Sequence, residues 1–264
     1  MESISTQYPI SLQDIWDNMN LQLRVSLVCD CIYLGDLERR RMAQGAHEYL
    51  IENIQYQILD NISATKNAYD LAFRNPSKEL YWVALKKELI NNDVSTKQSF
   101  WTNYDLKIIY PALPAKKNVV SINPFQSSTL NLNSNELFDI RDSASNLASE
   151  NYNSFCCNYF NYYVPFEKHT NSINPGINNY AFSINPEQHQ PSGECNFSRI
   201  LSTTLNFNLD SRMFNYNLSD VYPNITPGSS GDATYDTNVI VYVFTKTLNV
   251  LRIISGFGRL AFGI

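Results

Sequence analysis

The pattern of apolar and polar residues predicts a strand followed by a helix near the start of the chain. Apolar and polar residues alternate over 21–34, in the sequence LQLRVSLVCDCIYL, as expected for a half-buried strand. Gly35 and Asp36 interrupt the alternation, and the Asp36 carboxylate is suited to cap a helix. Apolar residues then recur at helical spacing, at Met42, Ala46 and Tyr49 or Leu50. We therefore expect a short helix over 37–51.

Further strands are predicted after this helix. In NIQYQIL, residues 53–59, the period changes to two, and Ile54, Tyr56 and Ile58 fall on one face. Other stretches have strand composition and are bounded by Asn, Pro, Gly or Ser. They are AYDLAF, KELYWVALKKE, STLNLNSNELF, INNYAFSI, NFSRILSTTLNFNL, NVIVYVFT and LNVLRIISG.

The connections between these strands indicate the fold class. From Lys87 to Asn118 the chain is polar and aromatic, and a loop of that length usually forms a tower or a contact surface. Residues 143–160 have the composition for a short helix before another strand. Roughly seven or eight strands, no alternation of strands with helices, and long loops predict an all-β fold, a jelly-roll β-sandwich.

The sequence QPSGECNFSRI, residues 190–200, predicts a corner in the chain. Pro191 fixes φ at about −65°, which suits an early turn position. Gly193 can adopt the positive φ that most residues avoid. We therefore expect a structural turn at Pro191 and Gly193 that leads into a strand carrying Arg199.

Composition narrows the choice of partner. The 264 residues carry a formal net charge of −5, and the isoelectric point is about 5.2. A protein that binds nucleic acid needs a basic face, and no long basic run occurs, so no nucleic-acid partner is expected. The aromatic content of 13% suits sheets, in which aromatic side chains pack across strands.

Neither the cysteines nor the ends of the chain indicate secretion or membrane insertion. The odd number of cysteines, with one vicinal pair, is a poor disulfide framework and favours a reducing compartment. The cysteines are Cys29, Cys31, Cys156, Cys157 and Cys195. The start, MESISTQYPISLQD, has no apolar core typical of a secretory signal. The apolar stretch from Val239 is interrupted by Lys246, Arg252 and Arg259, so we expect buried strands there and no direct membrane insertion.

The residues that most often carry chemistry form no recognisable constellation. No two of His47, His169 and His189 have the short spacing of a metal site, so neither a metal nor another cofactor is expected. Ser192 and Cys195 lie near His189 in sequence, but a loop rich in turn residues explains all three. We therefore predict no catalytic residue, and an enzyme is the least favoured class of function.

Arginine offers more information than histidine. Glu38 is followed by three arginines in the first turn of the predicted helix, where they oppose the positive end of the helix dipole. They either form a solvated face or bind fixed partners across a domain or subunit boundary, for which guanidinium is suited. The same alternatives hold for arginines in predicted strands. The candidates for interdomain or intersubunit pairing are Glu38, Arg39, Arg40, Arg41, Arg199 and Arg252.

Four stretches of the chain, taken in order, resemble a known family. They are CIYLGDLERRRMAQGAHEYLIENIQ, NPSKELYWV, NPGINNYAFSINPEQHQPSGECNFSRI and LNVLRIISGFGRLAF. They are similar to signature stretches of the major capsid proteins of nucleocytoplasmic large DNA viruses. The resemblance runs from about residue 22 to the C-terminus. It is specific, because four multi-residue stretches match in the same order.

The resemblance implies the C-terminal part of a double jelly-roll protein. Residues 1–52 then form a stub, made of the last strand of a first barrel and a helical connector at ERRRMAQGAHEYL. Residues 53–264 form the second jelly roll. Within it, QPSG looks like a rigid turn between adjacent strands of the barrel, and NFSRI begins the next wall of the sandwich.

The resemblance also implies a structural role in the virion, after synthesis in the host cytoplasm. The expected partners are other capsid chains, in a homotrimer. Three copies of two barrels give six similar lobes, so such a trimer can tile the pseudo-hexagonal lattice of an icosahedral capsid. No enzyme activity and no cofactor are implied.

Alternatives remain open at this stage. Only about twenty residues precede the first matching strand, too few for seven strands of a first barrel. The chain is then a piece completed by another chain, a divergent paralogue that serves as a minor or scaffold-like shell component, or a degenerate product. A jelly-roll carbohydrate-binding module is a second class of function, with Trp101, Tyr104 and Tyr110 available to stack on sugars.

Overall fold

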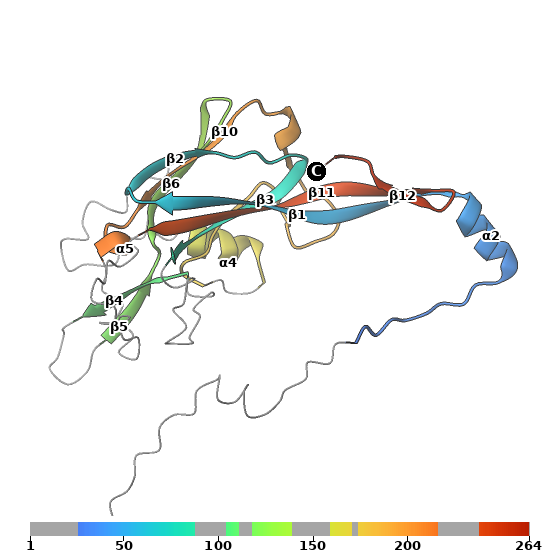
Figure 1. Cartoon of the computed structure of the whole chain (residues 1–264), viewed down its shortest axis with the longest axis horizontal. Coiled ribbons are helices and arrows are strands. Elements are labelled where there is room, and N and C mark those ends of the chain that lie inside the picture. Colours follow the sequence, from blue (N-terminus) through green and yellow to red (C-terminus); the bar gives the residue numbers. More distant parts are fainter. Residues whose placement is uncertain are drawn as a thin grey trace, which may run out of the picture.

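The computed structural model describes residues 26–87, 104–110, 118–138, 159–170, 174–215 and 238–263. These residues form two antiparallel sheets and a separate two-stranded ribbon (Figure 1). The first sheet has the order β1 (Ala46–Ile62), β11 (Val239–Ile254), β3 (Pro76–Lys86) and β8 (Asn178–Ala181), with β12 (Phe257–Leu260) beside β11 and β9 (Cys195–Asn196) beside β3. The second has the order β2 (Lys66–Asp70), β10 (Thr203–Leu209), β6 (Phe125–Leu132) and β7 (Asn135–Phe138).

The strand order confirms the predicted jelly roll. Successive strands β1, β2 and β3 alternate between the two sheets, and β11 pairs with β1 although most of the chain separates them. Each main sheet path contains four strands, and all of their pairings are antiparallel. Two such sheets, connected across the barrel rather than by hairpins alone, define this β-sandwich.

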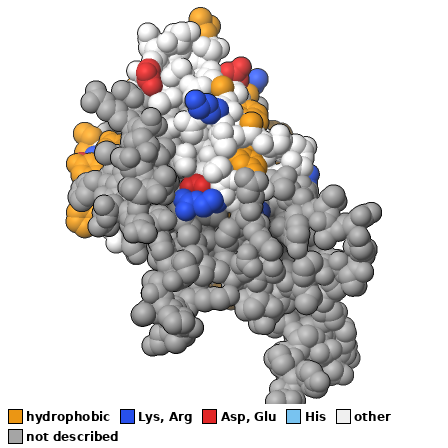
Figure 2. All heavy atoms as spheres, turned by 90° about the vertical axis from the view of Figure 1, so that its left-hand side faces the viewer, with side chains coloured by type: hydrophobic (Ala, Val, Ile, Leu, Met, Phe, Trp, Pro, Cys, Tyr) orange, Lys and Arg blue, Asp and Glu red, His pale blue; other side chains and the backbone are white. Residues whose placement is uncertain are grey.

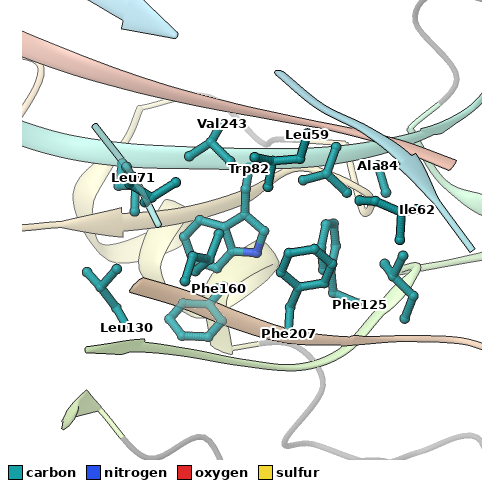
Figure 3. Packing of buried hydrophobic residues seen from close by; sticks show 14 of the residues in the cluster. Leu59, Ile62, Leu71, Trp82, Ala84, Phe125, Leu130, Phe160, Phe207 and Val243 are labelled. Atoms are coloured by element: carbon teal, nitrogen blue, oxygen red, sulfur yellow. The ribbon is translucent and has the colours of Figure 1, made fainter. Parts of the chain in front are cut away.

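The core lies between the two sheets (Figure 3). Trp82 of β3 contributes the largest buried side chain, and its ring centroid lies 4.9 Å from that of Phe160 in an edge-to-face contact. Its indole Nε1 donates a hydrogen bond to Ser128 Oγ over 3.2 Å, so the one polar atom of the ring is satisfied. Leu130 and Phe207 pack from the second sheet. Burial of such side chains contributes about 1.5–3 kcal/mol each.

In the described part of the chain, five short helical segments accompany the sheets. They are α2 (Asp36–Gln44), the π-helix η3 (Tyr159–Tyr163), α4 (Val164–Lys168), the 3-10 helix η4 (Phe197–Arg199) and α5 (Arg212–Asn215). The η3 segment carries Phe160 into the core, whereas α2 has no buried residue and lies at the far end of β1 (Figure 1). The position of α2 is therefore set by its covalent link to β1 and not by packing.

The predicted strand over 21–34 is wrong for the part that the structure describes. Residues 26–35 form no strand, and they extend away from the sandwich towards α2 (Figure 1). Apolar side chains along this arm, which we define as residues 26–35, are open to solvent: Leu27 is 88% and Tyr33 94% exposed. The physical reason is that a strand needs a neighbouring strand for its backbone hydrogen bonds, and no described residue supplies one.

The predicted helix is shorter than expected. It ends at Gln44, Asp36 is its first residue rather than its cap, and the N-cap Gly35 makes no side-chain hydrogen bond. Residues 46–51 belong to β1 and pair with β11, beginning at Ala46 opposite Ile254. A helix that buries no apolar side chain gains little stability. Pairing along β11 instead satisfies the backbone hydrogen bonds of residues 46–51 and places their side chains beside those of the neighbouring strand.

Several predicted strand boundaries also change. NVIVYVFT and LNVLRIISG form one continuous strand, β11, and STLNLNSNELF forms the β6–β7 hairpin, where Asn133 and Ser134 have φ of 51° and 65°. The predicted long connection contains the ribbon of β4 (Leu106–Tyr110) and β5 (Asn118–Ile122). Its remainder, 88–103 and 111–117, and residues 143–158 of the predicted helical stretch lie outside the described residues.

Candidate functional site

The corner predicted at Pro191 and Gly193 is part of a loop, residues 182–194, that leaves and rejoins the same edge of one strand. β8 pairs with β3 at Ala181 opposite Glu79, and β9 pairs with β3 at Cys195 opposite Ser77. The prediction of a turn between adjacent strands of the barrel is therefore wrong. The loop protrudes from the edge of the first sheet and returns to it.

Three hydrogen bonds between the two ends of the loop close it at its base. The backbone N–H of Ile184 donates to the carbonyl of Ser192 over 3.2 Å, and Asn185 N–H donates to Ser192 Oγ over 2.8 Å. Ser183 Oγ donates to the carbonyl of Gly193 over 2.9 Å. Gly193 has φ of 126°, and a Cβ there would lie 3.1 Å from the carbonyl oxygen of Phe182. Both the backbone conformation and the close approach favour glycine at this position.

A buried lysine anchors the tip of the loop to the sheet. The Lys78 side chain is completely buried, and its Nζ lies 2.7 Å from Glu52 Oε1 of β1 and donates to the backbone carbonyl of Gln188. Lys246 Nζ of β11 lies 3.1 Å from the other Glu52 oxygen and donates to the carbonyl of Pro186 over 3.2 Å. Three strands of the first sheet and the loop thus share one network.

The network places the ammonium groups of Lys78 and Lys246 against the single carboxylate of Glu52. Burial raises the pKa of the Glu52 carboxyl, but hydrogen bonds and charge from Lys78 and Lys246 outweigh burial and leave the pKa below its usual value. Each lysine also donates to a loop carbonyl. The network therefore satisfies polar groups of the loop backbone that would otherwise be unpaired against the sheet.

A second group of charges holds the other side of the loop. The His169 ring lies between two carboxylates, with Nε2 3.2 Å from Glu79 Oε2 and Nδ1 3.3 Å from Glu187 Oε1. The Thr170 backbone N–H also donates to Glu187 Oε1, over 3.0 Å. Tyr81 OH lies 3.4 Å from His169 Nε2. This group joins β3, the residues after α4, and the loop.

The environment shifts the pKa of several of these groups. The hydrogen bond to Glu79 is the largest cause that raises the pKa of His169 above its ordinary value, and it outweighs burial. Hydrogen bonds from Thr170 and His169 lower the pKa of Glu187. Burial and the Glu79 charge raise the pKa of Tyr81. Tyr81 therefore stays protonated as the pH rises, and Glu187 stays ionised as it falls.

We call the network of Lys78, Glu52 and Lys246 and the group of His169, Glu79 and Glu187 the loop anchors. The sequence patterns predicted neither of them. A local signal exists: Lys78 and Glu79 are adjacent charged residues inside an otherwise apolar strand, and both are almost completely buried. Charges of this kind require partners, because an unpaired buried charge is costly. Their partners are distant in sequence, so the signal points to a network without naming its members.

The anchors have no arrangement typical of catalysis. Ser192 Oγ bonds the backbone of Asn185, and burial raises the pKa of the Cys195 thiol, which lowers the fraction of reactive thiolate. Within the described ranges, no group of three His, Cys, Asp or Glu side chains is placed to hold a metal ion. The chemistry available to these residues is hydrogen bonding and charge pairing.

The structure does not bring the predicted arginine candidates together. Arg39 Nη2 lies 3.5 Å from Asp36 on the exposed surface of α2, and the described part of the chain supplies no ion pair to Arg40 or Arg41. Arg252 Nε of β11 lies 2.7 Å from Glu48 Oε1 of β1, its directly opposed residue. That pairing lies within the chain.

Arg199 and Glu38 lie in helical segments, on the surface of the molecule. Arg199 lies in η4 and not in a strand, because NFSRI forms a single helical turn before β10 begins at Thr203. Glu38 lies in the first turn of α2, where a carboxylate suits the helix dipole. Both residues are exposed, and neither forms an ion pair with the part of the chain that the structure describes.

The outer face of the first sheet carries an exposed apolar surface. Ile54 is 73% and Tyr56 64% exposed, and Ile58 follows on the same face of β1. Tyr56 packs beside Phe244 of β11 with ring centroids 6.3 Å apart, and Phe244 stacks on Tyr242 at 6.2 Å. We call these five residues the β1–β11 apolar face. Contiguous exposed aromatic and aliphatic side chains are typical of a binding surface.

The described residues on the end of the molecule seen in Figure 2 form no basic patch. Among the described residues there, Lys and Arg side chains stand singly between polar ones, with acidic side chains close by. None of the helices in the described part of the chain has the length and apolarity needed to span a bilayer.

A family model supplies the decisive comparison. The model, described as large eukaryotic DNA virus major capsid protein, matches residues 38–259, which include most of α2 and nearly all of both sheets. The chain belongs to this capsid protein family. The resemblance drawn from the four sequence stretches is thereby confirmed.

Curated capsid proteins are similar to the chain over most of its length. The major capsid protein of Phaeocystis pouchetii virus is 29% identical over 90% of this chain and 52% of its own length. Probable capsid protein 4 of Acanthamoeba polyphaga mimivirus is 31% identical over 89% of this chain and 38% of its own length. The major capsid protein of Paramecium bursaria Chlorella virus 1 is 29% identical, with shares of 91% and 54%. The chain thus spans about half the length of these relatives, or less.

A solved capsid structure shares the fold. The PBCV-1 virus capsid, a quasi-atomic model, superposes with a TM-score of 0.59 and 24% sequence identity, covering 88% of this chain and 55% of that chain. The likeness agrees with the jelly roll built by the two sheets. The architecture of this chain is therefore that of a capsid protein.

Proposed function

We propose that this chain is a structural component of the icosahedral shell of a large DNA virus and acts by binding other capsid chains rather than by catalysis. The observation that carries the proposal is the family match over residues 38–259. The loop anchors support the proposal. Their charged groups are paired with one another and stabilise a surface loop, and none of them activates a described nucleophile. The chain is then located in the virion, after synthesis in the host cytoplasm.

We further propose that the arm becomes the last strand of a first jelly roll, in the same polypeptide or on another chain. Leu27, Val28, Ile32 and Tyr33 supply apolar side chains that are now in water, and the backbone of the arm has no sheet partner among the described residues. Pairing in a first barrel would satisfy both. We place the boundary between this stub and the second jelly roll at Gly45, where α2 ends.

The trimer is also a proposal. Three copies of a two-barrel unit give six lobes, which fit a pseudo-hexagonal lattice. The β1–β11 apolar face offers a surface for one of the barrel contacts, because association removes its aromatic and aliphatic side chains from water. The net charge of −5 and the scattered basic side chains favour protein partners over nucleic acid or membrane.

Mass spectrometry of purified virus particles tests the shell proposal. We expect peptides from this chain in a fixed ratio to the other shell proteins. In solution, light scattering during gel filtration should detect trimers or larger assemblies when a first barrel is present. Replacing Ile54 and Tyr56 by Ser should weaken assembly, whereas Leu201→Ser, at another exposed apolar residue, should not. Absence from particles, or a chain that stays monomeric with a first barrel, would refute the proposal.

A groove on the second sheet favours carbohydrate binding as a second candidate function. It measures about 400 Å³ and is lined by amide and hydroxyl side chains, including Asn206, Asn208, Ser127 and Thr129. Such groups suit the hydroxyls of a sugar. Of the aromatic candidates, Trp101 lies outside the described residues, the Tyr110 side chain is not described, and Tyr104 is not among the residues that line the groove. Retention on a glycan resin that Asn206→Ala abolishes would favour this function over the shell role.

A further inference from the structure

Both ring nitrogens of His169 face carboxylate oxygens. Nε2 lies 3.2 Å from Glu79 Oε2 and Nδ1 lies 3.3 Å from Glu187 Oε1, and the histidine side chain is 8% exposed. A neutral imidazole carries one N–H and one lone pair, so it can donate to only one of the two carboxylates. Only the imidazolium can donate to both. The observed geometry is therefore that of the protonated ring.

Other groups around the ring do not replace this charge. On β3, Tyr81 OH lies near Nε2 and remains neutral, and on β8 Asn179 Nδ2 lies 3.5 Å from Glu79 Oε2. Thr170 donates to Glu187 from its backbone and its hydroxyl. The nearby cations have carboxylates of their own: Lys168 lies 3.2 Å from Glu167, and Lys246 of β11 lies 3.1 Å from Glu52. His169 is thus the one described cation in contact with both Glu79 and Glu187.

We propose that His169 is a proton-dependent latch, which holds the loop 182–194 against the edge of the first sheet while its ring is charged and releases Glu187 when the ring loses a proton to solvent. Glu79 is 2% exposed, so solvent cannot replace the hydrogen bond that it accepts from the ring. The single N–H of the neutral His169 ring should therefore stay on Nε2. The bare Nδ1 lone pair then faces the Glu187 carboxylate, and the contact becomes repulsive. This inference does not depend on the shell role.

The sign of the pH dependence follows from linkage. The latched His169 has a pKa above its ordinary value of 6.5, chiefly because of Glu79. Glu79 holds the ring whether the loop is closed or open, so the Glu187 contact is what couples the proton to opening, and it makes the His169 pKa higher in the closed loop than in the open loop. The latch is therefore fully effective below the His169 pKa of the open loop and is lost as the pH rises through the pKa of the latched ring. Between these two pKa values, the equilibrium constant for opening the loop should rise by up to about tenfold per pH unit.

Release should be local. Lys78 and Lys246 still bind the backbone carbonyls of Gln188 and Pro186, and Ser192 still closes the base of the loop. Loss of the His169 contact therefore frees the Glu187 side of the loop, while the two sheets remain paired. The Glu187 side chain is then free to take other positions at alkaline pH, while the anchored carbonyls on either side of it stay in place.

Two measurements on the full chain test the latch. The chain has only three histidines, so a ¹⁵N-histidine NMR titration resolves each ring. We expect His169 to titrate above 6.5. Hydrogen exchange of peptides over 182–194, corrected for the intrinsic rate, should show protection that falls by up to about tenfold per pH unit in that window. The variant His169→Gln should remove this dependence, and His189→Gln, in the same loop, should preserve it.

A second variant keeps the test decisive if His169→Gln does not fold. Glu187→Gln leaves the buried Glu79 contact intact and removes the carboxylate that faces Nδ1. It should lower the pKa of His169 and weaken the pH dependence of loop protection. A His169 pKa below 6.5 would overturn the proposal. So would loop protection that keeps its pH dependence in either the His169→Gln or the Glu187→Gln variant.

Discussion

Lys78 of β3 reaches across β11 to place its Nζ 2.7 Å from Glu52 Oε1 of β1. The lysine is completely buried, and the same ammonium donates to the carbonyl of Gln188 in the loop 182–194. A single side chain thereby connects two strands that are not neighbours with a surface loop. Charged residues of this kind stabilise a specific arrangement more than they stabilise folding in general.

Replacing Lys78 by Met should destabilise the chain. The apolar side chain fits the buried path, but it leaves the Gln188 carbonyl without its donor and Glu52 with Lys246 as its remaining described cation. We expect a loss of about 2 kcal/mol in the free energy of unfolding, measured by urea denaturation. Lys66→Met, at an exposed lysine of β2, is the matched control and should change little. Equal values for both variants would contradict the anchor.

Replacing Gly193 by Val should damage the loop. Gly193 has φ of 126°, and a side chain there approaches the Phe182 carbonyl oxygen at 3.1 Å. A β-branched residue resists this conformation, and we expect a cost of about 1–3 kcal/mol, seen as a lower melting temperature. Gly35→Ala, where φ is −63° and no atom lies within 4 Å of a Cβ, serves as the control. An unchanged melting temperature for Gly193→Val would disprove this account of the loop.

The three arginines of α2 should matter for assembly rather than for folding. Because α2 has no buried residue, changing Arg39, Arg40 and Arg41 together to Gln should leave the melting temperature of the jelly roll almost unchanged. Assembly with other capsid chains, followed by light scattering, should weaken. Arg199→Gln, at an exposed arginine of η4, is the comparison. If the triple variant lost monomer stability while assembly was untouched, the intersubunit role would be wrong.

Asp210 should contribute stability that disappears in acid. Burial raises the pKa of this carboxyl, but hydrogen bonds from the Arg212 side chain and backbone outweigh burial, so the pKa lies below its ordinary value of 3.8. Its contribution is present above pH 3.8 and is lost as the pH falls through the lowered pKa. Asp210→Asn should cost about 1–3 kcal/mol at pH 7 and flatten the acid limb of urea denaturation.

The matched control for Asp210 is Asp30→Asn in the exposed arm, which should alter neither the stability at pH 7 nor its acid dependence. If Asp210→Asn kept the full acid dependence of the original chain, carboxylates elsewhere would be responsible. The ion pair to Arg212, with Nη2 2.5 Å from Asp210 Oδ2, would then contribute little to folding.

Periodicity predicted the sandwich because its signal is local. In TTLNFNL of β10, the buried residues are Thr203, Leu205, Phe207 and Leu209, and the residues between them are partly exposed, as a period of two requires. The same reasoning found β3 and most of β11. Fold class follows from such patterns, because each strand declares its own buried face.

The loop anchors could not be read from the same patterns. Glu52 and Lys78 meet only after β11 has joined their two strands into one sheet. His169 meets Glu79 only after α4 is placed beside β8. The alternation over 21–34 was misleading for a related reason. A periodic segment becomes a strand only when a neighbouring strand is available, and that neighbour is not written in the segment itself.

The position of β11 has a consequence for biosynthesis. It pairs with β1 on one side and β3 on the other, yet it leaves the ribosome long after both. Until then the nascent chain holds two unjoined strands with open edges and wet apolar side chains. Such non-local pairing is slow and prone to misassembly. We therefore expect the sandwich to close only after β11 has left the ribosome, with chaperones shielding the open strand edges until then.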